Sequence, residues 1–200
     1  MGRPSQHDRD RLLDAAIDLA CESGPAGVTV AAVARAAGAP SGSVYHRFPS
    51  AAALLAAVWL RTLERFQDGF IAAASGDPAE HAAAAAARHV VAWSRAHPSE
   101  ARLLMYGPRD FGESDWPAAD RNRLANGNRR VRDALTALAA RLGHPNNLER
   151  VLLATVDTPY GLVRRHLHAS TPIPPAAEDI VAAAATVLCR SPEHRPDLSN

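Results

Sequence analysis

Apolar side chains recur every three or four positions along most of the chain, which is the spacing of an amphipathic helix. Glycine, proline, serine and asparagine residues interrupt this pattern and predict where helices end. Alanine-rich runs with few β-branched stretches favour helices as well. The sequence therefore predicts an all-α fold of about nine helices, over residues 8–23, 30–37, 42–48, 51–74, 78–96, 97–106, 118–142, 148–167 and 176–189.

Two of these predicted helices are short and follow each other closely, in the segment 28–48. Thr29 is a typical N-cap for the first of them. Gly38 can end that helix in the left-handed conformation, and Ser41 offers a cap for the next one. The segment is therefore expected to form two helices joined by a tight turn.

The second short helix has an apolar face and a face of small and polar residues. Val44 and Phe48 lie four positions apart and can anchor the apolar face. In a helix-turn-helix element the second helix enters the major groove of DNA with its first residues at the base edges, while hydroxyl and guanidinium groups reach the backbone. We therefore predict a DNA-reading element whose contacts come from Thr29, Ser41, Gly42, Ser43, Tyr45, His46 and Arg47.

The same segment resembles the signature of the TetR-type family of bacterial repressors. The matching positions are Thr29, Val33, Ala34, Ala37, Gly38, Ser41, Gly42, Ser43, Tyr45 and Phe48. The resemblance implies an N-terminal three-helix DNA-binding domain over residues 1–50, a helical effector-binding and dimerisation domain over residues 51–190, and a flexible tail over residues 191–200. It also implies a double-stranded DNA operator, repression as the default, and release by a small-molecule effector that the sequence does not identify.

Two residues depart from that signature. Arg47 stands where the family usually has histidine, and Ala51 stands where it usually has a lysine that touches phosphate. The first difference keeps a hydrogen-bond donor, whereas the second removes one contact to the DNA backbone. Arg47 and the helix N-termini are therefore expected to supply a larger share of the contacts to phosphate.

Composition adds constraints on charge and on the compartment. The formal net charge is +1, so affinity for DNA has to come from the local placement of charge. Cys21 and Cys189 each lie in an apolar helical context, which favours buried thiols in a reducing cytoplasm. The chain has no secretion leader and no run of about 18 uncharged apolar residues, so we expect a cytoplasmic protein that does not enter a membrane.

Large apolar residues of the middle helices are candidates for an effector pocket, with Thr158 as a polar group near them. The predicted set is Trp59, Phe66, Trp93, Leu104, Met105, Tyr106, Phe111, Trp116, Thr158 and Tyr160. A packed core uses the same residue types, and the pattern alone does not separate the two uses.

A homodimer is expected because a recognition helix of two turns reads only a few base pairs, and a second copy is needed about one DNA turn away. The last two predicted helices are the candidates for its interface, through Leu152, Val156, Tyr160, Val163, Ile180, Val181, Ala184, Val187 and Leu188. These stripes also suit an internal core. Pro159 is expected to kink the first of the two helices.

An enzyme is the rival reading from a different functional class. Histidines at positions 81, 89 and 97 invite a metal interpretation, as does the pair His166 and His168, but a spacing of eight turns successive residues by about 80° around a helix. No HExxH, GxSxG, P-loop or CxxC pattern is present. We therefore predict no catalytic residue, metal site or cofactor, and keep as alternative an all-α small-molecule-binding protein or enzyme without DNA binding.

A third hypothesis is a protein that has the DNA-binding fold but has lost its affinity for DNA. The only indication of this is Ala51, which stands where the family usually has a lysine.

Overall fold

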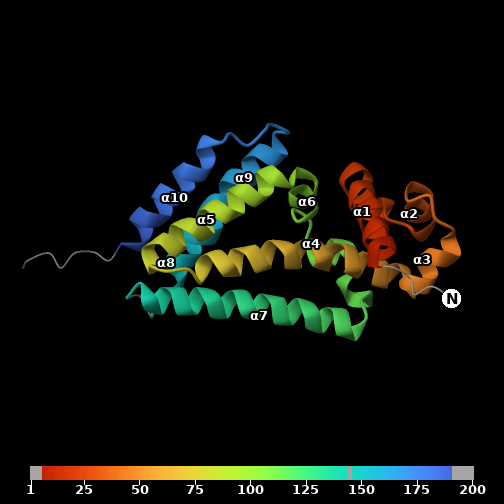
Figure 1. The fold of residues 1–200 in the computed structure, drawn as a ribbon, viewed down its shortest axis with the longest axis horizontal. Helices are drawn as coiled ribbons and strands as arrows, with labels where there is room; N and C mark the ends of the chain where they lie inside the picture. The colour runs from red at the N-terminus through yellow and green to blue at the C-terminus, as the bar shows by residue number, and fades with distance from the viewer. Residues whose placement is uncertain (1–5, 144–145, 191–200) are drawn as a thin grey trace, which may run out of the picture. The chain divides into compact units, whose positions relative to one another are not determined.

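The computed structural model describes residues 6–143 and 146–190, with side chains from Arg9 onward. Every regular element within those ranges is helical and none is a strand, which confirms the all-α prediction (Figure 1). The tail predicted over residues 191–200 lies outside the described residues. The α-helices are α1 (Gln6–Ser23), α2 (Val30–Ala36), α3 (Ser41–Arg47), α4 (Ala51–Ala74), α5 (Ala79–Ala96), α6 (Pro98–Leu103), α7 (Ala118–Arg141), α8 (Leu148–Leu152), α9 (Thr158–His168) and α10 (Ala176–Cys189).

Helix boundaries agree with the prediction to within two residues, except where short turns replace a regular helix. α4 and α10 have the predicted bounds. The helix predicted to reach Tyr106 ends at Leu103, and the segment expected to be a loop contains two 3-10 turns, η2 (Pro108–Phe111) and η3 (Glu113–Asp115). A further 3-10 turn, η1 (Pro25–Gly27), joins α1 to the segment before α2. Such turns close with only three or four residues, which is too short for a period to be recognised in the sequence.

Pro159 divides the helix predicted over residues 148–167. α8 is followed by a π-helical turn (Leu153–Asp157), and α9 starts one residue before the proline. Proline has no backbone N–H, so the regular bond to the carbonyl four residues earlier cannot form. That bond would reach the Thr155 carbonyl. One residue before the proline, the Thr158 amide and hydroxyl both donate to the Leu153 carbonyl, the hydroxyl at 2.8 Å. The nine predicted helices are therefore present as ten α-helical segments in the described residues.

The described chain divides into two compact units. The first contains the residues up to 65 together with 97–127, and the second contains 66–96 together with the described residues from 128 onward. α4 and α7 each contribute one part to each unit. In the first unit, α1, α2 and α3 gather around the first turns of α4 (Figure 1). The prediction of a DNA-binding domain over residues 1–50 concerns function and stays a prediction; the compact unit around it is longer.

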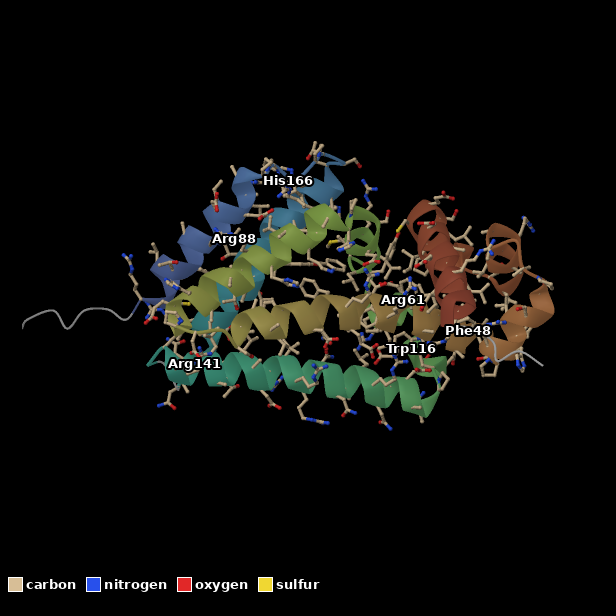
Figure 2. The ribbon with its side chains drawn as sticks, in the orientation of Figure 1. Phe48, Arg61, Arg88, Trp116, Arg141 and His166 are labelled. Atoms are coloured by element: carbon tan, nitrogen blue, oxygen red, sulfur yellow. The ribbon has the colours of Figure 1, made fainter. Side chains whose placement is uncertain are left out.

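Trp116 packs the segment that follows α6 against α4 within the first unit. Its side chain is 1% exposed, and its indole Nε1 donates to the Phe111 carbonyl at 2.8 Å. The indole ring lies 5.8 Å from that of Trp59, measured between ring centroids. Two residues further along α4, Arg61 reaches α1 and bonds the Asp14 carboxylate at 2.5 Å (Figure 2). Both the apolar core and an ion pair therefore hold α4 in this unit.

α5 and α10 pack on each other in the second unit. Arg88 bonds the Asp179 carboxylate at 2.6 Å, and Arg95 bonds that of Glu178 (Figure 2). Both helices carry small buried side chains, among them Ala83 and Ala86 of α5 and Ala182 and Ala185 of α10. Small side chains allow close packing of two helices, which buries the apolar faces of both.

His89 of α5 lies directly on the backbone of α4 at Gly69. A Cβ added to Gly69 would come 2.4 Å from His89 Cε1, so any side chain there would displace the imidazole. The imidazole Nε2 donates to the Phe66 carbonyl at 3.0 Å, and the ring lies 5.4 Å from the Phe66 ring. Burial lowers the pKa of His89 below its ordinary value of 6.5, against the smaller opposing effect of the bond to Phe66.

Acid is expected to destabilise the protein partly through His89. Its pKa is lower in the folded than in the unfolded chain, so the unfolded state holds more protons between the folded pKa and about 6.5. This contribution to stability is present above about pH 6.5 and is lost as the pH falls through the folded pKa. His89→Gln keeps a donor for the Phe66 carbonyl, and its Tm should fall less than that of the wild type between about pH 7.5 and pH 5. An equal fall in both proteins would show that His89 does not titrate in this range.

Candidate nucleic-acid interface

α2 begins and ends as the sequence predicts. The Thr29 hydroxyl accepts a hydrogen bond from the Ala32 amide at 3.1 Å, which satisfies one of the unpaired N–H groups of the helix start. At the other end Gly38 has a φ of 61°, and the Ala39 amide donates to the Ala34 carbonyl at 2.8 Å. This is the Schellman closure, in which glycine avoids the strain that a side chain would meet. The turn fixes the position at which α3 begins.

α3 begins one residue earlier than predicted. Pro40 occupies the N-cap position with extended backbone, and no side chain caps the helix. The prediction that Ser41 is the cap is therefore wrong, because Ser41 is the first helical residue. The Ser43 amide donates to the Pro40 carbonyl at 2.9 Å instead. As a result the side chain of Ser41 is exposed at the start of α3.

The two faces of α3 have opposite character. Val44 is fully buried and Phe48, directly after the helix, is 2% exposed, so both predicted anchors are confirmed. The Arg9 guanidinium of α1 lies 5.4 Å from the centre of the Phe48 ring, where it adds a cation–π contact (Figure 2). Tyr45 is 57% exposed, and His46 is exposed as well. The polar face of α3 is therefore open to a partner.

Arg47 makes two hydrogen bonds to Ser43, one turn earlier in α3. Its Nη1 donates to the Ser43 carbonyl at 3.0 Å and to the Ser43 hydroxyl at 2.6 Å. Both side chains are thus engaged with each other, and a contact of either with DNA would compete with this pair. The prediction that Arg47 and Ser43 touch DNA stays a prediction, beside an intrahelical role that the sequence did not indicate.

The start of α4 follows α3 directly. The Ser50 hydroxyl accepts a hydrogen bond from the Ala53 amide at 3.0 Å, which confirms the cap predicted at Pro49 and Ser50. Ala51 is exposed. It offers a methyl group at the position where the TetR-type signature has a basic side chain, so its side chain cannot contact phosphate.

Gly42→Ala is expected to separate DNA binding from stability. A Cβ added to Gly42 meets no atom within 4 Å, and alanine favours a helix over glycine by up to about 1 kcal/mol. The variant should therefore unfold at the same or a higher temperature, while its extra methyl group keeps α3 away from the groove and weakens DNA binding. Thermal unfolding and DNA titration of the same preparation measure both effects. Unchanged DNA affinity would show that Gly42 does not face the DNA.

The candidate pocket residues belong to both units. Trp59, Leu104, Met105, Tyr106, Phe111 and Trp116 lie in the first unit, and Phe66, Trp93, Thr158 and Tyr160 lie in the second. In the first unit the Tyr106 ring meets the Phe111 ring edge-on at 6.4 Å, measured between centroids, and Phe111 is fully buried. In the second unit Phe66 meets Trp93 edge-on at 5.2 Å. Their role in an effector site stays a prediction.

The candidate dimer residues fall into an exposed and a buried group. Tyr160, Ile180 and Val187 are exposed large hydrophobic residues, whereas Val163 and Val181 belong to the core of the second unit. Leu152, Val156, Ala184 and Leu188 are half-buried. Side chains that are already packed inside one protomer cannot form an interface, so Val163 and Val181 are better described as core residues. Leu153, which the sequence prediction omitted, is exposed near Tyr160 in the chain.

Two further observations concern metals and membranes. The described side chains include no group of three or more His, Cys, Asp or Glu that could hold a metal ion. None of the helices in the described parts of the chain is both long and apolar enough to span a bilayer.

Comparison with known proteins identifies the segment that contains α2 and α3. Residues 12–58 match the family described as bacterial regulatory proteins, tetR family. No curated protein matches the chain. The match covers α2, α3, most of α1 and the first turns of α4, so it includes the complete helix-turn-helix element.

Solved structures match over nearly the whole chain. The TetR family regulator PfmR from Thermus thermophilus is 19% identical, with a TM-score of 0.68 over 92% of this chain and 97% of that chain. A TetR family regulator from Marinobacter aquaeolei is 18% identical, with a TM-score of 0.71 over 90% and 94%. The fatty acid degradation regulator FadR from Bacillus halodurans is 16% identical, with a TM-score of 0.71 over 96% and 100%. At these identities the likeness shows the fold, an N-terminal helix-turn-helix domain followed by a helical domain.

Proposed function

Because residues 12–58 match the family of bacterial regulatory proteins described as tetR family, we propose that the protein is a DNA-binding transcriptional regulator, a repressor that leaves a palindromic operator when a small-molecule effector binds. The observation that carries the DNA-binding part is α3. It has a buried apolar anchor on one face and exposed serine, tyrosine and histidine side chains on the other. This is the distribution that a recognition helix needs.

The DNA contacts that we propose are those of the polar face of α3 and the start of α2. Ser41 and Gly42 lie at the exposed N-terminal end of α3, which is the end that meets base edges in a helix-turn-helix complex. Tyr45 and His46 extend the contact along the groove. Thr29 is exposed at the N-terminus of α2, where its helix end favours a phosphate.

The repressor acts as a homodimer through α9, α10 and the π-helical turn before α9. Exposed Leu153, Tyr160, Ile180 and Val187 support this proposal, because large apolar side chains are stabilised when a second copy covers them. Two-fold symmetry then pairs two copies of α3 with two half-sites.

The effector is a small molecule with apolar surface, held among the aromatic residues of the helical domain. The edge-on contact of Phe66 on α4 with Trp93 on α5, within the second unit, supports this part of the proposal. A regulator of chromosomal DNA acts in the cytoplasm and needs no catalytic group.

Selection of genomic DNA fragments by the purified full-length protein tests the proposal. Recovery of one palindromic motif, with half-sites about one helical turn apart, is the expected result. Fragments without a shared motif, or no enrichment even at low salt, would overturn it in favour of an all-α small-molecule-binding protein or an enzyme. Repression is then tested by transcription from a promoter that carries the selected motif, where added protein should lower the yield.

A further inference from the structure

The basic side chains that the sequence predicts at the DNA interface do not by themselves explain binding to the DNA phosphates. The Arg47 guanidinium is bonded to Ser43, and Ala51 has no basic group. Phosphate contacts supply most of the non-specific affinity of a DNA-binding protein. Another basic side chain near α3 is therefore needed.

Arg11 of α1 lies beside the turn that leads into α3. Its Nη2 lies 3.7 Å from the position that a Cβ on Gly38 would occupy, and Arg11 is exposed. Because α3 enters the groove with its N-terminus, the turn that precedes it lies near the groove edge, where the phosphates run. A helix outside the two-helix motif therefore places a guanidinium beside the turn that leads into α3.

Three described charged side chains of α1 that lie near Arg11 in the chain have partners. Arg9 lies over the Phe48 ring, and Asp10 and Asp14 lie 3.9 Å and 2.5 Å from the Arg61 guanidinium. Among the described residues no carboxylate lies within ion-pair distance of Arg11. Its charge is therefore available to an anion from outside.

Arg11 also lines an open hollow of about 240 Å³ between α1 and the end of α2. Asp18 and Glu22 of α1 line the same hollow. At 1.5 Å per residue they lie about 10 Å and 16 Å from Arg11 along the helix axis. Carboxylates repel phosphate, so the charge distribution along α1 favours a DNA backbone at the Arg11 end.

We propose that Arg11 binds an operator phosphate beside the turn between α2 and α3, and thereby replaces the contact that Ala51 cannot make. A guanidinium can bond two phosphate oxygens at once, which suits a single contact that has to orient a helix. This inference rests on the proposed function, because it names one contact of the same DNA site.

Arg11→Ala tests the proposal on the selected operator fragment, with Arg102→Ala as the matched control on α6, an exposed arginine of the same unit. Operator affinity is measured between about 50 and 200 mM salt. The slope of log affinity against log salt should fall by about 0.9 for each lost contact, which is about 1.8 for a dimer with two copies of Arg11. The salt-dependent loss of affinity over this range should then be roughly tenfold smaller than in the wild type. Arg11→Lys should restore part of the slope, and Arg102→Ala should leave it unchanged.

Thermal unfolding separates this role from a structural one. A guanidinium near the end of α2 also favours the negative end of the helix dipole. A lower Tm for Arg11→Ala with an unchanged salt slope would assign Arg11 to that role and overturn the proposal. If the wild type binds the operator and the Arg11→Ala and Arg102→Ala variants have equal salt slopes, the proposal is overturned too. A wild type that binds no DNA would refute the proposed function and this inference together.

Discussion

Replacing Ile180 and Val187 together with glutamate is expected to convert the proposed dimer into monomers and to weaken operator binding at least about 100-fold. Both side chains are more than 60% exposed on α10, at 61% and 64%. Covering an aliphatic side chain of this size is worth about 1.5–3 kcal/mol, and a two-fold interface contains two copies of each. Glutamate in the same place buries an unpaired charge instead. A monomer then reads only one half-site. Light scattering gives the mass, and titration of the selected operator gives the affinity.

Ala72→Glu is the matched control for this experiment. Ala72 is exposed on α4 in the same unit, but it is not part of the exposed apolar set. The control should remain a dimer and bind the operator as the wild type does. A double variant that keeps both the dimer mass and full affinity would place the interface elsewhere, and a monomeric wild type would refute the dimer itself.

Trp116→Ala is expected to destabilise the protein by about 3–5 kcal/mol, the usual cost of deleting a large buried aromatic side chain. The variant loses the contact with Trp59 and leaves a cavity in the core of the first unit. It also removes the donor to the Phe111 carbonyl. For a chain of this length the Tm should fall by roughly 10 °C. Denaturant unfolding followed by circular dichroism measures the change.

Tyr106→Ala serves as the comparison, because Tyr106 also follows α6 but is 40% exposed. Its loss should cost much less stability than the loss of Trp116. Trp116→Phe should lie between them, since it keeps most of the volume but loses the hydrogen bond to Phe111. Similar Tm values for the Trp116→Ala and Tyr106→Ala variants would show that Trp116 does not hold this segment.

The helix-turn-helix element was predictable because local chemistry specifies it. Thr29 caps α2 and Gly38 adopts the left-handed conformation, and each needs only its immediate neighbours in the chain to do so. The error at Ser41 has a local cause too. Both Pro40 and Ser41 suit the start of a helix, and the residue-type preference for serine gave the wrong choice. The π-helical turn before Pro159 was not predictable as such, because the sequence indicates the lost bond but not how the helix closes around it.

The amino-acid sequence by itself determined the helical class, most helix boundaries and the segment that matches the tetR family, because all of these depend on spacings of a few residues. Only the tertiary structure decided which apolar stripe is core and which is surface, as for buried Val181 and exposed Ile180. It also decided that His89 lies on Gly69 and that Arg11 lies beside Gly38, residues separated by 20 and 27 positions in the chain. The physical reason is that the burial of a side chain, its pKa and the direction of a charged group depend on neighbours that folding brings together. The local spacing of apolar residues contains no information on these neighbours.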